Sequence, residues 1–243
     1  MIISFVQTKG GTGKSTLAVN TTFSKAFHEK FKSIALVELD PQGTLKNWWQ
    51  ERTEENRNSD NVSFHHISST QKEVIQDRIK NIATHNDILV LDIPGESTSK
   101  FHTKFACAIS DIVIIPMRTS TNDESAFADN LLPIIKEIIR SYPIKKVNFF
   151  FLPTFTNAQS NKEKVIDYFK DILPDYVGCL DVVYPFRSIY ENFNREGMNL
   201  LEYVDSIKSN KRLYVGGARA IEDIECIAHS ILHKLAEKTH DSA

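Results

Sequence analysis

The sequence predicts an α/β fold, a doubly wound and mainly parallel sheet with helices on both faces. Short apolar runs of strand length alternate with segments of helical spacing along the 243 residues. A glycine-rich turn follows the first run, and a carboxylate ends the second and fourth runs. Because open parallel sheets bind ligands at the carboxyl ends of their strands, the pattern also predicts where a site lies.

Length and charge restrict what the chain can be. We expect one domain over residues 1–243, with the last few residues disordered. A net charge of −2 does not indicate nucleic-acid binding by the chain as a whole, so any DNA contact must come from a local basic patch. Three dispersed cysteines without metal spacing fit a cytosolic protein. The first strand begins at once, so we expect no signal peptide, and no apolar run approaches the ~18 residues of a membrane span.

The first apolar run leads into a phosphate site. Residues 2–6 predict a buried strand and residues 15–27 a helix, with glycines between them that aim backbone N–H groups at an anion. Lys14 can reach the β/γ-phosphates, and the Ser15 hydroxyl is placed to bind Mg²⁺. The residues expected to hold the nucleotide are Lys9, Gly10, Gly11, Thr12, Gly13, Lys14, Ser15 and Thr16.

A second lysine, Lys9, makes this loop resemble the deviant Walker A motif of the ParA/MinD family of P-loop ATPases, closest to small ParA-type plasmid partition ATPases. Thr8 stands where the general pattern has glycine. The resemblance implies ATP and Mg²⁺ as ligands and an ATP-dependent dimer, in which Lys9 reaches the phosphates held by the other subunit. The alternative is a solvated lysine beside an ordinary turn, but the strand and helix context favours the motif.

The second strand, residues 33–39, ends at Asp40-Pro41-Gln42. This segment resembles the family's Asp-x-Asp-Pro-Gln, with Glu38 in place of the first aspartate. The resemblance implies that Asp40 positions or activates the attacking water. The role of Glu38 is left open.

The fourth strand, residues 87–92, ends at Asp92, which resembles a Walker B acid that holds Mg²⁺ directly or through water. Pro94 and Gly95 follow, and the family usually has a second proline where Gly95 stands. The metal ligands expected are therefore Ser15 and Asp92.

The other elements follow from apolar spacing. His65 and His66 lie in a predicted strand and are expected to be structural, without nearby partners. The expected strands are 62–66, 111–116, 146–152 and 178–183, and the expected helices are 45–52, 70–85, 123–140, 161–173 and 218–235.

Residues near the base are less defined. The family carries a Val-Ile-Ile-Pro segment followed by a serine and an aspartate, which here are Ser120 and Asp123. Pro116 either lines the adenine or simply ends its strand. Thr156 and Asn157 are further candidates for base recognition. Residues 184–190 and 197 resemble a late segment of the family that lies near the nucleotide and the partner surface.

The C-terminal helix bears on the choice between family branches. In the MinD branch such a helix binds membrane, but an interfacial helix is rich in lysine and arginine. Here Glu222, Asp223 and Glu225 occupy the polar face, so core packing without membrane contact is favoured. A basic cluster precedes and enters it, either as a solvated face or, as in ParA proteins, as a non-specific DNA site: Lys208, Lys211, Arg212 and Arg219.

Taken together, the resemblance implies a ParA-type partition ATPase, cytoplasmic and nucleoid-associated. Its ATP-bound homodimer would bind non-specific DNA, and a ParB-like centromere-binding partner would stimulate hydrolysis. The alternatives are a MinD-like membrane-cycling regulator and the same ATPase positioning a protein cargo or assisting conjugative DNA transfer. An iron–sulfur reductase of the nitrogenase iron-protein type needs two suitably placed cysteines, and only Cys107 lies near mid-chain.

Overall fold

A computed structural model describes residues 1–95, 100–142, 148–156 and 161–240. Within these residues the strands form one eight-stranded sheet in the order β3-β2-β4-β1-β5-β6-β7, with β8 paired to β6, and the pairs are parallel. The strands are β1 (Ile2–Phe5), β2 (Ile34–Glu38), β3 (Val62–His66), β4 (Ile88–Asp92), β5 (Ile112–Met117), β6 (Asn148–Thr156), β7 (Gly178–Cys179) and β8 (Tyr184–Pro185).

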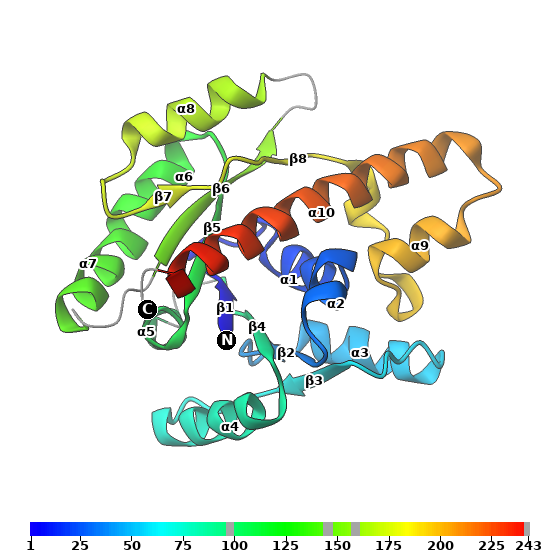
Figure 1. The fold of residues 1–243 in the computed structure, drawn as a ribbon, viewed down its shortest axis with the longest axis horizontal. Helices are drawn as coiled ribbons and strands as arrows, with labels where there is room; N and C mark the ends of the chain where they lie inside the picture. Colours follow the sequence, from blue (N-terminus) through cyan, green and yellow to red (C-terminus); the bar gives the residue numbers. More distant parts are fainter. Residues whose placement is uncertain (96–99, 143–147, 157–160, 241–243) are drawn as a thin grey trace.

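Helices cover both faces of the sheet (Figure 1). Helices α1, α2, α3, α9 and α10 pack on one face, and α4, α5, α7 and α8 on the other. The predicted doubly wound architecture is confirmed. The helices are α1 (Lys14–Thr22), α2 (Lys25–Lys30), α3 (Thr44–Glu54), α4 (Lys72–His85), α5 (Lys100–Ile109), α6 (Thr121–Ala126), α7 (Leu132–Ser141), α8 (Lys162–Ile172), α9 (Leu200–Ser206) and α10 (Lys211–His240).

The central strands are apolar throughout because both their faces are covered. In β2, Ile34 and Leu36 join the core under α1 and α10, whereas Ala35 and Val37 join the core under α4 and α5. All four side chains are fully buried. This two-sided burial is what the continuous apolar runs of the sequence predict.

The predicted helix over residues 15–27 is in fact two helices. Helix α1 ends at Thr22, and α2 begins at Lys25. The Ser24 hydroxyl oxygen accepts a hydrogen bond from the Phe27 amide, which caps the new helix. The polar residue inside the apolar pattern therefore marks a break.

The C-terminal helix begins at Lys211, seven residues before the predicted start at 218. A Cβ on Gly217 would lie 2.5 Å from a methyl group of Val204 in α9. Gly217 is thus a close-packing position inside the helix, although glycine is a poor helix former. Likewise, the predicted helix over 123–140 contains a π-helical turn at Phe127–Leu131 between α6 and α7.

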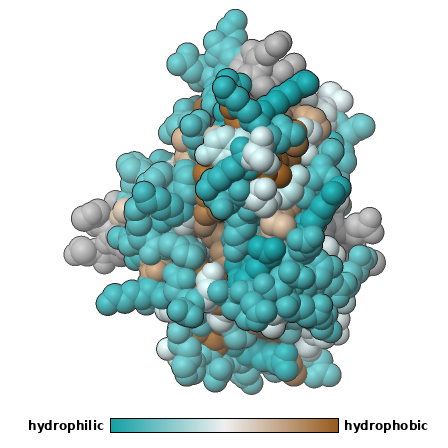
Figure 2. All heavy atoms as spheres, turned by 90° about the vertical axis from the view of Figure 1, so that its right-hand side faces the viewer, coloured by the Kyte–Doolittle hydropathy of each residue, from teal (hydrophilic) through white to brown (hydrophobic). Residues whose placement is uncertain are grey.

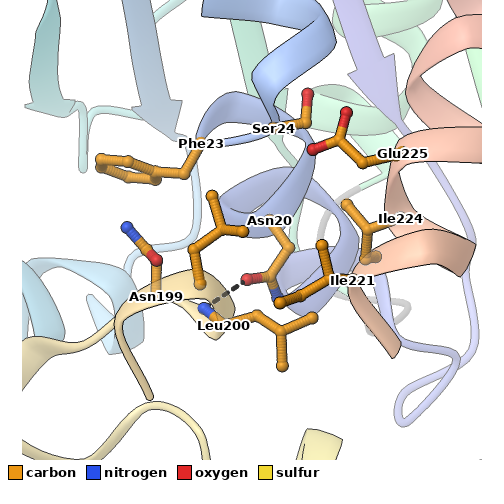
Figure 3. A pocket seen from close by; sticks show the side chains of 9 residues that line it. Asn20, Phe23, Ser24, Asn199, Leu200, Ile221, Ile224 and Glu225 are labelled. Carbon is orange, nitrogen blue, oxygen red and sulfur yellow. Dashed lines mark hydrogen bonds between the residues drawn. The ribbon is translucent and has the colours of Figure 1, made fainter. Parts of the chain in front are cut away.

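Polar contacts seat α9 and α10 on α1 and α2 (Figure 3). The Asn20 side-chain oxygen accepts a hydrogen bond from the Leu200 amide at 3.0 Å. The Glu225 carboxylate accepts from the amides of Lys25 and Ala26 at 2.7 and 3.0 Å, which satisfies the first turn of α2. Glu225, which the sequence places on the polar face of α10, therefore caps the start of α2. This contact is consistent with α10 packing on the core.

A buried arginine braces α3 against the segment before α9. Arg52 is fully buried and lies 4.5 Å over the Phe23 ring. Its guanidinium donates to both Glu202 carboxylate oxygens at 2.6 and 2.8 Å and to the Gly197 carbonyl oxygen at 3.1 Å. Trp48, one turn earlier, donates its indole N–H to the Met198 carbonyl at 2.9 Å. We call these contacts the Arg52 brace.

Candidate nucleotide-binding site

The glycine-rich loop joins the end of β1 to the start of α1. Gly11 has φ +69° and Gly13 has φ +89°, conformations that L side chains rarely adopt. Gly13 is also the residue just before α1, so the backbone N–H groups of the loop lie at the positive end of the helix dipole. Strands β4 and β5 flank β1, which brings the residues at their carboxyl ends to the same edge.

Ser15 and Asp92 meet there, as the sequence predicts. The Ser15 hydroxyl donates to Asp92 Oδ2 at 2.7 Å, and Asp92 is only 2% exposed. Burial raises the pKa of Asp92 to about 7, while the Ser15 hydrogen bond and the Lys14 charge oppose that rise. The buried Asp92 Oδ1 has no hydrogen-bond partner within the described part of the chain.

These two side chains fit a hydroxyl-plus-carboxylate site for Mg²⁺. A bound cation would give the buried Asp92 Oδ1 a partner, and a buried carboxylate oxygen without a partner is energetically costly. No group of three or more His, Cys, Asp or Glu side chains that could hold a metal occurs among the residues that the structure describes. Any Mg²⁺ at Ser15 and Asp92 therefore depends on further oxygens, such as phosphates and water.

Lys14 is the first residue of α1, directly after the loop, and it is buried. Its ammonium donates to the Lys9 carbonyl oxygen at 3.3 Å. Burial lowers the pKa of Lys14, and the carboxylates of Asp92 and Asp40 oppose that effect. A Cβ on Gly95 would lie 2.7 Å from Lys14 Nζ, so the missing side chain at position 95 leaves room for the ammonium.

The Lys9 side chain reaches the start of α6. Its ammonium forms an ion pair with Asp123 Oδ1. The Lys9 side chain is 40% exposed and that of Asp123 only 1%. The second lysine of the motif is therefore held at the surface of a single chain by a buried carboxylate.

The acids at the end of β2 have different surroundings. Asp40 is half-buried, and its Oδ1 accepts from the Gln42 amide at 2.9 Å. Glu38 is fully buried and binds the amides of Leu45 and Lys46 at 2.8 and 3.0 Å. Burial raises the pKa of Glu38, and these two N–H groups oppose the rise. Glu38 is thus the anion that satisfies the first turn of α3, which answers the question that the sequence leaves open.

His66 does have a partner, contrary to the sequence-based expectation. Its Nε2 lies 3.0 Å from the Asp40 carbonyl oxygen. His65 Nε2 lies 3.2 Å from the Ser63 hydroxyl. Both histidines still act as structural groups in these contacts.

A hollow of about 450 Å³ opens beside the loop. It begins at Gly11, Gly13 and Thr16 and continues to the rings of Phe155, Tyr184 and Phe186, with Arg118 at its rim. The Arg118 guanidinium stacks 4.4 Å over Phe155 and donates to the Gly11 carbonyl oxygen. Aromatic faces next to a phosphate loop suit a nucleotide base.

The other predicted nucleotide residues are arranged around this hollow. Thr12 is buried, and a Cβ on Gly10 would meet nothing within 4 Å. Pro116 is buried within β5 and is not among the residues lining the hollow. Thr156 is buried at the end of β6, and Asn157 lies outside the described residues.

Sequence reasoning missed Arg118, Phe155 and the Lys9–Asp123 pair. Phe155 has φ +53°, which is rare for a bulky residue and occurs at ligand clamps. No spacing in the sequence indicates that conformation. A signal for Arg118 was its place between Pro116 and Ser120, at the end of a central strand.

The predicted basic cluster lies on exposed positions around the start of α10. Lys211, Arg212 and Arg219 fall within about 100° of one another around the helix axis, so they share a face. Lys208 precedes the helix and forms an ion pair with Asp205. The structure brings three of the four cations together and leaves the fourth partly neutralised.

Comparisons with known proteins agree with this geometry. The CobQ/CobB/MinD/ParA nucleotide binding domain matches residues 3–241. No curated protein sequence matches the chain significantly.

Similar folds occur among solved structures. A plasmid partition protein from Borrelia burgdorferi bound to AMPPNP is 17% identical, with 96% of this chain and 98% of that one covered and a TM-score of 0.60. A complex of a Cyanothece McdA variant with ATP is 13% identical, with 95% of each chain covered and a TM-score of 0.64. Cobyrinic acid a,c-diamide synthase from Mycobacterium smegmatis, with an ATP analogue and magnesium, is 15% identical, with 79% and 92% covered and a TM-score of 0.58. At these identities the likeness shows a shared fold.

Proposed function

The chain belongs to the CobQ/CobB/MinD/ParA nucleotide-binding family, and on that premise we propose that it is a ParA-type ATPase that partitions DNA. The observation that carries this proposal is the pair of lysines on the loop: Lys14 is buried at the start of α1, and the Lys9 side chain is 40% exposed. Lys14 serves the phosphates of its own nucleotide. Lys9, once released from Asp123, serves those of the second subunit in an ATP-bound homodimer.

The remaining roles follow from where each side chain lies. Ser15 and Asp92 would hold Mg²⁺, which supplies charge neutralisation for the phosphates. Asp40 orients the attacking water, because its carboxylate is half-exposed at the strand end next to Lys14. The base occupies the aromatic hollow, and the similar structures with ATP or its analogues support ATP as the nucleotide.

DNA binding belongs to the basic cluster. A chain of net charge −2 attracts DNA weakly as a whole, but two dimer-related clusters would double the positive charge on one side. A ParB-like centromere-binding protein would stimulate hydrolysis and release the nucleoid DNA. Membrane binding is not favoured, because Ile224, Ile227, Ile231 and Leu235 of α10 are buried in the core. Across the described residues, no helix is both long and apolar enough to span a bilayer.

The nucleotide part of the proposal is tested with Lys14→Ala and Lys9→Ala. Removing a charged hydrogen-bond donor costs about 1.5–3 kcal/mol, so Lys14→Ala should weaken ATP binding by about 10- to 100-fold. Lys9→Ala should bind ATP with nearly unchanged affinity but neither dimerise nor hydrolyse it. Calorimetry gives the affinities and sizing chromatography with ATP gives the dimer. A normal ATP-bound dimer of Lys9→Ala would contradict the role assigned to Lys9.

The DNA part is tested with Lys211→Ala plus Arg212→Ala. Each phosphate contact contributes about 0.9 to the slope of log affinity against log salt, so the double variant should lose up to about 4 per dimer. Affinity should fall equally on unrelated sequences, because backbone contacts carry no base information. Fluorescence anisotropy with ATP, with ADP and without nucleotide is the measurement. An unchanged salt slope would mean that the basic cluster is a solvated surface that does not contact DNA.

A further inference from the structure

A second depression lies on the side of the molecule formed by the start of α10. It is a groove of about 760 Å³ between α9, the first turns of α10 and a short 3₁₀ turn at Ser188–Glu191. Figure 2 views the molecule from this side, where apolar atoms interrupt a mostly hydrophilic face. The apolar side chains that line the groove are Phe186, Ile189, Tyr203, Ile207 and Leu213.

Two of these side chains are unusually exposed. Phe186 and Leu213 are each 51% exposed, although both are large and apolar. Exposed apolar side chains that gather around one depression, with polar residues at its rim, are typical of interaction sites. Their partial exposure leaves apolar area that a ligand could cover.

Adjacent glycines of α10 have opposite surroundings. A Cβ on Gly217 would lie 2.5 Å from Val204 and 3.0 Å from Ile189, and Ile189 lines the groove. A Cβ on Gly216 would meet nothing within 4 Å, and Gly216 lines the groove. The backbone therefore leaves the groove open at position 216, and a side chain added there would start in open space.

The charge of the groove is one-sided. Its lining includes two guanidinium groups, Arg187 and Arg212, and no carboxylate. Arg187 is held in an ion pair with Asp223, whereas Arg212 has no ion-pair partner within the described ranges. Lys211 and Arg219 stand exposed nearby on the same face of α10. An occupant would thus meet free positive charge beside apolar surface.

We propose that this groove binds an acidic segment of a partner protein, with a large apolar side chain seated between Phe186 and Leu213 and carboxylates on Arg212. The proposal goes beyond the proposed function, because Arg212 also belongs to the predicted DNA-binding cluster and an acidic segment would compete with DNA for it. Charge complementarity selects an acidic ligand. DNA could neutralise Arg212, but its phosphodiester backbone offers no apolar group to cover Phe186 and Leu213.

The groove also shares a wall with the nucleotide hollow. Phe186 and Arg187 line both depressions. A ligand that packs on Phe186 therefore contacts the residue that borders the base site. Binding in the groove and binding of the nucleotide should change each other's affinity by the same factor, as linkage requires.

The test selects ligands from a displayed library of short random peptides against the intact protein with and without ATP. Enriched peptides should combine acidic residues with a large apolar residue, and labelled copies are then titrated by fluorescence anisotropy. Gly216→Trp, which fills the groove, and Leu213→Glu, which repels an acidic ligand, should each weaken binding at least about tenfold. Val74→Glu is the matched control, because Val74 is an exposed apolar residue on α4, and it should leave binding unchanged.

Several outcomes would overturn the docking site. Selected peptides that are basic or uncharged, or that bind Gly216→Trp as well as the unaltered protein, would do so. Loss of ATP-dependent self-association in Gly216→Trp would assign the groove to a second copy instead. Failure of the proposed function is separate, because it would appear as absent ATP hydrolysis in the unaltered protein, while peptide binding without nucleotide can still be measured.

Discussion

Replacing Asp92 by asparagine should stabilise the empty protein while removing its metal site. The Asp92 carboxyl is almost fully buried, and one of its oxygens has no partner in the described residues. Burial raises its pKa from an ordinary value of 3.8 to about 7. The folded chain therefore holds a proton on Asp92 at acidities where the unfolded chain has lost it. An asparagine keeps the shape of the side chain without that charge.

The magnitude follows from this difference in pKa. A rise from 3.8 to about 7 corresponds to at most about 4 kcal/mol of destabilisation above neutrality. Because the folded state binds more protons than the unfolded state between about pH 4 and 7, the Asp92 contribution lowers stability as pH rises through that window. The advantage of Asp92→Asn should grow by up to about 1.4 kcal/mol per pH unit there and level off above about pH 7.

Urea unfolding of both proteins at about pH 5, 6, 7 and 8, without nucleotide or metal, measures the effect. Asp87→Asn is a matched control at the exposed residue just before the same strand. The amides of Lys32 and Ser33 hold the pKa of Asp87 below its usual value. Its contribution is therefore present at neutral pH and lost as the pH falls, the opposite sign. An Asp92→Asn advantage that is independent of pH would refute the reasoning, as would stronger Mg²⁺-dependent ATP binding in that variant.

Three further substitutions test single contacts. Asp40→Ala should lower ATP turnover at least about tenfold and leave ATP affinity within about twofold, because the carboxylate acts on the water in the transition state. Partner-stimulated hydrolysis equal to that of the unaltered protein would contradict this role of Asp40. Gly197→Ala should cost about 2–4 kcal/mol in urea unfolding, because a Cβ would lie 2.2 Å from the Arg52 amide nitrogen at a φ of +66°. Glu38→Gln turns a donor toward the N–H groups of α3 and should cost about 1–3 kcal/mol, read from the thermal midpoint; an unchanged midpoint would mean that α3 does not need the cap.

The sequence predicts the centre of this fold better than its margins. Strands β1, β2, β4 and β5 are apolar runs that lie side by side, and burial on both faces explains why their pattern is easy to read. Helices α5 and α9 were not predicted, and α9 has only seven residues, too few for a clear apolar period. The predicted start of α10 at residue 218 is too late, because the helix continues through Gly216 and Gly217, and Gly217 packs closely against Val204 inside it.

The site shows the same division. Ser15 and Asp92 meet because both stand at the carboxyl edge of neighbouring parallel strands, a position that sequence order predicts. The cap formed by Glu38 could not be predicted, since its partners are backbone N–H groups seven and eight residues away. The Lys9–Asp123 pair joins residues 114 positions apart, and only the folded sheet brings them together.

The Arg52 brace has a consequence for how the protein opens. Arg52 is fully buried and bonded to Gly197 and Glu202. If α3 separated from residues 197–202, the Arg52 guanidinium would lose these hydrogen bonds. The two segments are distant in sequence but should unfold locally as one cooperative unit, with amide hydrogen exchange of α3 and α9 governed by one common free energy. Glu38 ties the other end of α3 to β2, beside Asp40. Slow exchange in α9 would therefore report on the integrity of the strand end that carries Asp40.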